Sequence, residues 1–349
     1  MRELPGRQPG AHAMILACDV GGTKTNVALL DRGVGGLQVV RLETFPSREH
    51  PSLHSILDSF LWPQPPRLEA AGFGVAGPVI GNRVETTNLP WKIDGPQLAA
   101  QLGLSGVSLL NDVEVQAWSI PVLGAEAQVT LKQGSANAGN IAVIAAGTGL
   151  GMAALLRGDG LVRSLASEGG HADFAPIDDI EIELLRTLRR RFGRVSAERV
   201  LSGPGLVNIF QFLRDEETHP LDPRLEEALR QADPAAAVSE AALTGKSLLA
   251  ERAVLIFLGS YGAAAGNWAL STMATGGVWL GGGIAHKLFV GPADTSTVWR
   301  ARAVDAFTAR FTQKGRLGPL LVAMPVQLIV SDEAPLLGAA QFALAEAGR

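Results

Sequence analysis

The segment Asp19-Val20-Gly21-Gly22-Thr23 has residue types and spacing that suit phosphate chemistry, and it directly follows a short apolar segment. Glycines let backbone N–H groups approach a phosphate, and a carboxylate at a strand end can hold Mg²⁺ through water. The spacing differs from that of a P-loop and from that of a G-x-G-x-x-G fingerprint that opens a helix. An ordinary hairpin turn is the alternative, and this segment alone leaves both interpretations open.

A second glycine turn, Gly147-Thr148-Gly149-Leu150-Gly151, repeats the arrangement between apolar segments at 141–145 and 152–157. Two strand–turn–strand hairpins predict two α/β halves that could hold one phosphate chain, and the repetition favours phosphate binding. Gly281-Gly282-Gly283 ends a further apolar segment. Close backbone approach to a flat ligand such as adenine and a purely structural turn are both compatible with this third motif.

Three other sites carry polar side chains that could bind a hydroxylated ligand. Asn111-Asp112 lies where a predicted strand stops and a helix starts, so Asp112 is a candidate base in an interdomain cleft or simply a helix cap. Glu168-Gly169-Gly170-His171 offers hydrogen-bond acceptors and donors on a glycine loop, as a sugar requires. A solvated loop or half of a metal site are the alternatives for this loop. Ser196-Ala197-Glu198-Arg199 is predicted to open a helix, and the alternative to a binding role is a cap at Ser196 with Glu198 complementing the helix dipole.

Alternating strand and helix patterns must position these residues, and they predict an α/β fold. An antiparallel meander is expected first, followed by apolar strands that end at Ala76, Leu110 and Ala145. The predicted strands cover 14–19, 26–31, 37–45, 70–76, 107–110, 141–145, 152–157, 277–280 and 326–330. The main predicted helices cover 52–61 with Ser52 as N-cap, 94–102 with Asp94 as cap, 180–192, 204–214, 234–243, 248–273 and 336–347.

The length of 349 residues exceeds what one hydrophobic core usually supports, so two domains are expected. We expect residues 1–13 to be a disordered leader without an export signal. Residues 14–118 are predicted to form a small α/β domain that the C-terminal helix 335–349 joins, and 119–334 a large α/β domain.

Composition excludes several function classes. The chain is 47% hydrophobic with a formal net charge of −4, which leaves no electrostatic footprint for nucleic acid or an anionic membrane. The longest apolar stretch, 253–273, contains Ser260 and Asn267 and is expected to be a buried helix rather than a membrane span. Cys18 is the single cysteine, so an internal disulfide and a multi-cysteine zinc site are excluded, and a reducing, cytoplasmic location is expected.

The ordered motifs together resemble the bacterial glucokinase family from residue 14 to the C-terminus. The matching segments are Asp19–Thr23, Leu110–Asp112, Ala146–Gly151, Glu168–Pro176 and Ser196–Leu206, and the runs around Glu168 and Glu198 are the most specific. The resemblance implies a two-domain hexokinase/actin-like (ribonuclease H-like) fold with an interdomain cleft. Cys18 departs from the family pattern, which commonly has glycine just before the first aspartate.

The same resemblance implies ATP-dependent phosphorylation of glucose by a homodimer. Asp112 would accept the proton of the sugar 6-hydroxyl, and Asp19 would orient Mg²⁺ through water. The implied ATP-binding residues are Cys18, Asp19, Val20, Gly21, Gly22, Thr23, Gly147, Thr148, Gly149 and Gly282. The implied glucose-binding residues are Asn111, Asp112, Glu168, His171, Glu198 and, in the segment 86–91, Asn88.

Three rival functions remain to be weighed. A sugar kinase of the repressor/ORF/kinase superfamily would carry a cysteine-rich zinc motif, which a chain with only Cys18 lacks. A sugar-sensing transcription regulator would need a DNA-binding module, for which the leader is too short and the net charge is of the wrong sign. An actin-like assembly protein would leave the polar residues of the Glu168–His171 loop without a purpose.

Overall fold

The computed structural model describes residues 13–33, 35–86, 88–135, 137–158, 160–216, 223–230 and 233–348. Most of the expected leader therefore lies outside the described residues. The chain divides into two compact units. The first contains the described residues up to Ala127 together with those from Ser331 onward, and the second contains those from Gln128 to Val330. The domain limits expected from the sequence stay a prediction.

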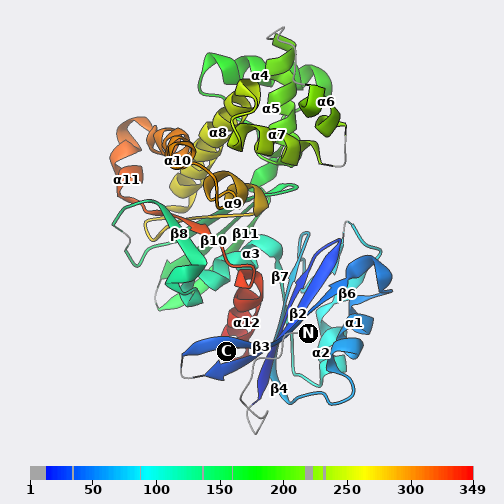
Figure 1. Cartoon of the computed structure of the whole chain (residues 1–349). Coiled ribbons are helices and arrows are strands. Elements are labelled where there is room, and N and C mark those ends of the chain that lie inside the picture. The colour runs from blue at the N-terminus through cyan, green and yellow to red at the C-terminus, as the bar shows by residue number, and fades with distance from the viewer. Residues whose placement is uncertain are drawn as a thin grey trace. The chain divides into compact units, whose positions relative to one another are not determined.

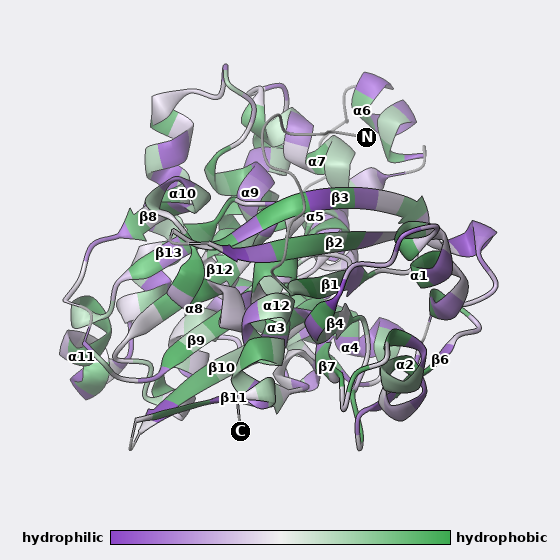
Figure 2. Ribbon diagram, turned by 90° about the horizontal axis from the view of Figure 1, so that it is seen from below, coloured by the Kyte–Doolittle hydropathy of each residue, from purple (hydrophilic) through white to green (hydrophobic). Residues whose placement is uncertain are grey.

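The first unit is built on a five-stranded mixed sheet with the order β3-β2-β1-β4-β7. Its strands are β1 (Met14–Val20), β2 (Lys24–Gly33), β3 (Gly36–Pro46), β4 (Leu68–Val75) and β7 (Ser108–Asn111). The predicted antiparallel meander is confirmed as β1, β2 and β3, and β4 and β7 run parallel to β1. Along β3 half-buried and exposed side chains alternate, and Figure 2 shows the strand in changing colours.

Helices cover both faces of this sheet (Figure 1). They are α1 (Leu53–Leu61) and α2 (Gly95–Leu102) on one face and α3 (Asp112–Ser119) and α12 (Ala334–Ala347) on the other, with β5 (Arg83–Glu85) and β6 (Lys92–Asp94) as a small hairpin. The predicted caps Ser52 and Asp94 are confirmed, since each side chain accepts a backbone N–H of its helix. Gly338 lets α12 approach α3, because a Cβ there would lie 1.7 Å from the Val115 carbonyl oxygen.

The second unit contains a six-stranded sheet with the order β11-β10-β9-β12-β13-β8. Its strands are β8 (Gln128–Lys132), β9 (Ile141–Ala146), β10 (Leu150–Gly158), β11 (Leu161–Ser167), β12 (Gly277–Gly281) and β13 (Val326–Ile329). The second predicted hairpin is confirmed as the antiparallel pair β9 and β10. Every residue of β9 is buried, and the strand is coloured as hydrophobic in Figure 2.

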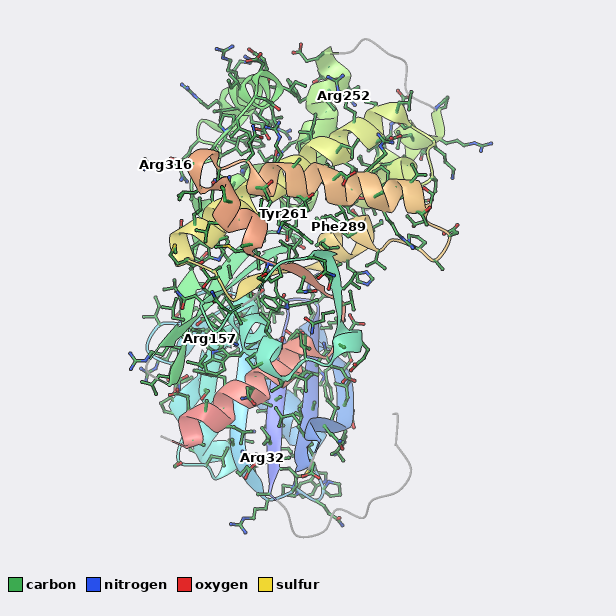
Figure 3. The ribbon with its side chains drawn as sticks, turned by 90° about the vertical axis from the view of Figure 1, so that its left-hand side faces the viewer. Arg32, Arg157, Arg252, Tyr261, Phe289 and Arg316 are labelled. Atoms are coloured by element: carbon green, nitrogen blue, oxygen red, sulfur yellow. The ribbon has the colours of Figure 1, made fainter. Side chains whose placement is uncertain are left out.

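Most helices belong to the second unit. They are α4 (Asp179–Phe192), α5 (Gly203–Glu216), α6 (Pro223–Leu229), α7 (Pro234–Leu243), α8 (Leu248–Thr272), α9 (Gly283–Phe289), α10 (Thr297–Thr312) and α11 (Gly318–Ala323). Tyr261 on α8 and Phe289 at the end of α9 point into the helical core (Figure 3), where both rings lie 5.6 Å from the ring of Phe307. Short 3₁₀ helices complete the chain at 47–49, 120–122, 125–127, 169–171, 197–199 and 315–317.

Helix α8 is long and apolar enough to cross a membrane by length and composition, the one such helix among the described residues. In the structure 67% of the most apolar 18-residue stretch of this helix is buried. The Tyr261 hydroxyl donates to the Ile144 carbonyl oxygen over 2.8 Å, and Trp268 Nε1 donates to the Ala153 carbonyl oxygen over 3.0 Å. These bonds to β9 and β10 confirm the expected buried helix, which packs against the sheet.

Candidate functional site

The first glycine turn joins β1 to β2 and is closed by its own backbone. Gly21 N–H donates to the Lys24 carbonyl oxygen over 3.0 Å. Asp19 precedes the turn, and Asn26 Nδ2 donates to its Oδ2 over 3.3 Å. Burial raises the pKa of Asp19, against the opposing effects of Asn26 and Lys24. Because a buried carboxylate is stabilised by a nearby cation and oxygen is the ligand Mg²⁺ prefers, this residue fits the predicted metal role.

Asn88 lies directly against this turn. A Cβ at Gly22 would be 2.8 Å from Asn88 Cβ, so only glycine allows the two segments to approach so closely. The exposed Asn88 side chain is thereby brought to the predicted phosphate turn. Cys18 and Val20 behave differently, because both side chains are buried in the core of the unit. Any contact of these two residues with a nucleotide would come from their backbone.

Asn111 and Asp112 lie at the carboxyl end of β7, on the same sheet as the first turn. Val20 pairs with Val75 on β4, and Val75 pairs with Asn111 on β7, so Asn111 is level with the end of β1 and about 10 Å from it. The parallel order of the three strands therefore brings the first turn and Asn111-Asp112 to one edge of the sheet.

The cap of α3 is Asn111, and Asp112 is the first residue of the helix. Asn111 Oδ1 accepts from Val113 N–H over 2.9 Å, while Nδ2 donates to the Gly77 carbonyl oxygen over 3.2 Å. Glu114 Oε2 accepts from Asn111 N–H over 3.3 Å and completes a capping box. The alternative that Asp112 is the cap is wrong. Asp112 is half-buried in the first turn of α3, where the helix dipole stabilises a carboxylate.

In the second unit, Glu198 lies on the second glycine turn. Its Oε2 accepts from Leu150 N–H over 3.0 Å, and a Cβ at Gly149 would come within 2.6 Å of the same oxygen. The turn itself is closed by Gly147 N–H donating to the Gly149 carbonyl oxygen over 2.9 Å. A predicted sugar-binding carboxylate and a predicted phosphate-binding turn are thus in direct contact.

The loop with Glu168 and His171 also contacts Leu150, at its carbonyl group rather than at the N–H that Glu198 binds. A Cβ at Gly170 would lie 1.9 Å from the Leu150 carbonyl oxygen, so the loop packs directly on that residue. His171 Nε2 lies 3.9 Å from Glu168 Oε2, and both side chains are exposed. The structure therefore gathers Glu168, His171 and Glu198 around the second turn.

Gly282 also lies beside this turn. Its φ of 85° belongs to the left-handed region, and a Cβ would lie 2.2 Å from the Ala146 carbonyl oxygen. Glycine is therefore required on steric grounds at this position. Its neighbour Gly281 pairs with Ala145 on the parallel strand β9, which places Gly282 next to the start of the Gly147–Gly149 turn.

Arg194, which the sequence analysis missed, ties the two sugar loops together. It donates to the His171 carbonyl oxygen over 2.8 Å and pairs with Asp173 at 2.7 Å. Alongside, Ala197 N–H donates to the Ala172 carbonyl oxygen over 2.8 Å. The predicted helix start at Ser196 is wrong, because only a three-residue 3₁₀ helix, Ala197–Arg199, forms there and Ser196 makes no side-chain cap bond. The long helix begins at Gly203, after the loop-to-loop bonds have ended.

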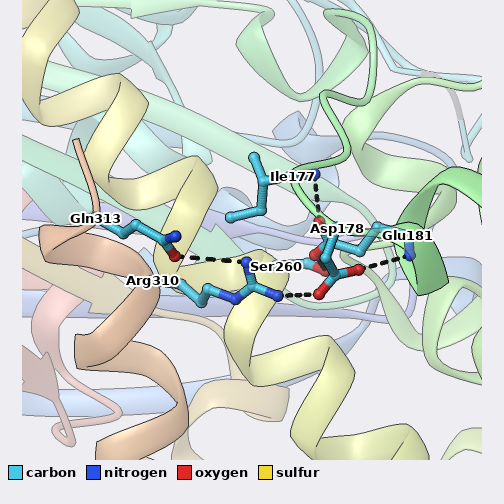
Figure 4. Close-up of polar contacts among 6 residues, drawn as sticks. All are labelled: Ile177, Asp178, Glu181, Ser260, Arg310 and Gln313. Atoms are coloured by element: carbon cyan, nitrogen blue, oxygen red, sulfur yellow. Dashed lines mark hydrogen bonds and ion pairs between the residues drawn. The ribbon is translucent and has the colours of Figure 1, made fainter. Parts of the chain in front are cut away.

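A buried polar network anchors the segment that follows the Glu168–His171 loop (Figure 4). Glu181 accepts from Ile177 N–H over 2.7 Å and from the Ser260 hydroxyl over 2.6 Å. Arg310 pairs with Asp178, which also caps α4 by accepting from Glu181 N–H. This anchor is not among the residues expected from the sequence, although Asp178-Asp179-Ile180-Glu181 has the spacing of a capping box.

Across the described ranges, no group of three or more His, Cys, Asp or Glu residues could hold a metal ion. Glu168 and His171 therefore have no third His, Cys, Asp or Glu side chain within the described ranges with which they could form a metal site.

Comparisons with known proteins point to one family. The family model named Glucokinase matches residues 16–346. The glucokinase of Nostoc sp. (strain PCC 7120 / SAG 25.82 / UTEX 2576) is 37% identical over 344 residues, which cover 94% of this chain and 98% of that protein. The glucokinase of Synechocystis sp. (strain ATCC 27184 / PCC 6803 / Kazusa) is 36% identical over 351 residues, covering 93% of this chain and 96% of that protein.

Solved structures agree. A glucokinase from an Antarctic psychrotroph is 30% identical with a TM-score of 0.83, over 96% of this chain and 100% of that chain. A ROK family glucokinase from Streptomyces griseus, solved with glucose and AMPPNP, has a TM-score of 0.61 at 21% identity, over 95% of this chain and 100% of that chain. At that identity the likeness shows the fold alone. The predicted α/β fold of the hexokinase/actin-like class is confirmed.

Proposed function

The chain belongs to the glucokinase family, and on that premise we propose that it transfers the γ-phosphoryl group of ATP to the 6-hydroxyl of D-glucose. One observation carries the assignment: Glu198 contacts the Gly147–Gly149 turn through Leu150 N–H, so candidate sugar and phosphate groups adjoin. The Streptomyces griseus neighbour was solved with glucose and AMPPNP, so this fold can bind a sugar together with an ATP analogue.

Sugar recognition is assigned to Glu168, His171 and Glu198, with Asn88 and Asn111 as further contacts. Carboxylates accept hydrogen bonds from sugar hydroxyls, and an imidazole can donate or accept. An analogue that lacks a hydroxyl, or has it inverted, would leave one of these groups unpaired, which would reject the analogue. Asn111 has less hydrogen-bonding capacity left for a sugar than the other residues, because its side chain already accepts from Val113 N–H and donates to the Gly77 carbonyl oxygen.

Asp112 is assigned as the general base. It would accept the proton of the 6-hydroxyl as that oxygen attacks the γ-phosphorus and the bond to the β-phosphate oxygen breaks. Its place supports this role, because Asp112 is half-buried at the carboxyl end of β7, and Asn111 rather than Asp112 supplies the cap of α3.

The phosphates of ATP are assigned to the two glycine turns, with Gly282 near the adenine. Backbone N–H groups of Val20–Thr23 and Gly147–Gly149 would stabilise the negative charge of the phosphates. Mg²⁺, when bound, neutralises charge on the β- and γ-phosphate oxygens. Asp19 would hold the Mg²⁺ ion through water, since Asp19 is a buried carboxylate at a strand end beside the turn.

We also propose that the protein acts in the cytoplasm as a homodimer, without nucleic acid or membrane partners. The net charge of −4 and the burial of α8 support the absence of such partners. The single cysteine is in keeping with a reducing compartment.

A coupled assay tests the proposal. Purified protein is mixed with ATP, Mg²⁺ and glucose, and glucose 6-phosphate is followed through its dehydrogenase. Glucose-dependent turnover that is lost without ATP and in Asp112→Ala is expected. Absence of turnover, with neither glucose nor ATP bound in calorimetry, would refute the proposed function.

A further inference from the structure

Two buried hydroxyl groups lie beneath the first glycine turn. Ser47 begins a 3₁₀ helix, Ser47–Glu49, directly after β3, and Thr25 lies near the start of β2. Both residues have 0% exposure, and Thr25 Oγ1 lies 2.9 Å from Ser47 Oγ. Buried hydroxyls are costly unless they are hydrogen-bonded, so the partners of this pair indicate what it holds in place.

The direction of each hydrogen bond follows from the chemistry of the acceptor. Ser47 Oγ lies 2.8 Å from the Gly21 carbonyl oxygen, and a carbonyl oxygen can only accept. The Ser47 proton is therefore used for Gly21, and the Thr25 hydroxyl must donate to Ser47. Ser47 N–H also donates to the Thr23 carbonyl oxygen over 3.0 Å. One residue thus holds two of the carbonyl groups of the turn.

These bonds determine where the turn's N–H groups point. In a planar trans peptide the C=O and the following N–H point in opposite directions. Since the Gly21 carbonyl points toward Ser47, the N–H of Gly22 points away from it. Within the described part of the chain this N–H has no hydrogen-bond partner, unlike Gly21 N–H, which is bonded to the Lys24 carbonyl oxygen. An outward N–H on a glycine is the group that a phosphate oxygen accepts from.

We propose that Ser47 is a positioning residue for the nucleotide, whose buried hydroxyl sets the peptide planes of the phosphate-binding turn Val20–Lys24. This inference rests on the proposed function, which assigns that turn to ATP. Ser47 itself does not contact the substrate. Thr25 supports it by donating to its oxygen, so that the proton of Ser47 stays directed at Gly21.

The first test is Ser47→Ala in the full-length protein. The KM for Mg·ATP should rise about tenfold, because one buried hydrogen bond is lost and the turn is released. The KM for glucose should stay within about twofold of its normal value, since Asn88 is the one residue assigned to glucose that packs against this turn, whereas Glu168, His171 and Glu198 surround the second turn. Dissociation constants of Mg·AMPPNP from calorimetry should follow the KM for Mg·ATP.

Matched variants separate positioning from simple loss of stability. Ser239→Ala removes another buried hydroxyl, which donates to the Ala235 carbonyl oxygen on α7, and should leave both KM values unchanged. Thr25→Val removes the supporting donor without changing shape and should raise the KM for Mg·ATP less than Ser47→Ala does. Thr25→Ser keeps the hydroxyl, so this variant should have a normal KM for Mg·ATP. If Ser47→Ala does not fold, the Thr25 pair decides by the same comparison.

Equal changes in both KM values, or a folded Ser47→Ala with a normal KM for Mg·ATP, would overturn the positioning role. The wild-type protein distinguishes this failure from failure of the proposed function. If it binds Mg·AMPPNP but does not phosphorylate glucose, the dissociation constants of the variants still decide the role of Ser47. If it binds no nucleotide at all, both proposals are wrong.

Discussion

Leu150 N–H donates to Glu198 Oε2 over 3.0 Å, and this bond joins the segment after β9 to the 3₁₀ helix Ala197–Arg199. The carboxylate therefore has two oxygens with different surroundings. Oε2 holds the backbone at the end of the second glycine turn, and Oε1 has no hydrogen-bond partner among the described residues. The charge of Glu198 and its shape can accordingly be tested separately.

Glu198→Gln is expected to weaken glucose binding more than ATP binding. The amide oxygen of glutamine can still accept from Leu150 N–H, so the turn keeps its conformation, while the charged acceptor for sugar hydroxyls is lost. Glu198→Ala, which removes both, should weaken binding of glucose and of Mg·AMPPNP. Calorimetry with each ligand measures this. Equal losses for both ligands in Glu198→Gln would argue against a sugar-contacting role.

Asp112→Ala is expected to lower kcat by about 10²–10⁴, the usual contribution of a general base. Asp112→Asn should lose a comparable factor while keeping the size of the side chain. Because Asn111 supplies the cap of α3, the melting temperature should change little in either variant. Steady-state kinetics and a thermal melt test this. Near-normal turnover would remove Asp112 from the role.

Asn111→Ala should destabilise the first unit by about 1–2 kcal/mol, because it removes the acceptor for Val113 N–H and the donor to Gly77. Asn111→Asp keeps the acceptor and loses only the donor, so its cost should be smaller. The free energy of unfolding from urea titration measures both. Identical losses in the two variants would show that the cap bond contributes nothing.

Gly170→Ala should raise the KM for glucose about tenfold to a hundredfold, because the added Cβ collides with the Leu150 carbonyl oxygen and displaces the sugar loop. Gly158→Ala on β10 is the matched control, since a Cβ there meets nothing within 4 Å. Its KM should be unchanged. A normal KM in Gly170→Ala would mean that the loop position is unimportant for sugar binding.

The thiol of Cys18 should not react with disulfide reagents in the folded protein. The side chain is 0% exposed, and burial, with a smaller effect of Asp19, raises the pKa of Cys18 well above its ordinary value. The Cys18 side chain therefore stays in the protonated thiol form even near pH 8.5, where a free cysteine is about half ionised. Titration with a chromogenic disulfide should find one reactive thiol per chain only after denaturation. Stoichiometric reaction of the folded protein at that pH would contradict the burial of Cys18.

Elements set by local chemistry were predictable. Glycine turns between apolar segments indicate both hairpins, and Ser52 and Asp94 are predictable caps because a cap acts on residues within one turn. The burial of α8 followed from its polar residues, which a membrane span would disfavour. The segment at Ser196 was predicted wrongly, because hydrogen bonds to the neighbouring loop at Asp173 replace those of a helix there.

By itself, the sequence determined the fold class and, through its motifs, the family and the candidate residues of the site. Tertiary structure alone decided which of these residues contact one another and which hydrogen bonds hold them in position. Glu198 meets Leu150 from 48 residues away, Ser47 meets Gly21 from 26, and Ser260 meets Glu181 from 79. Such contacts depend on how closely separate backbones approach, which glycines such as Gly22 and Gly170 permit. Periodicity and capping patterns report only on neighbours along the chain, so they contain no information about these distances.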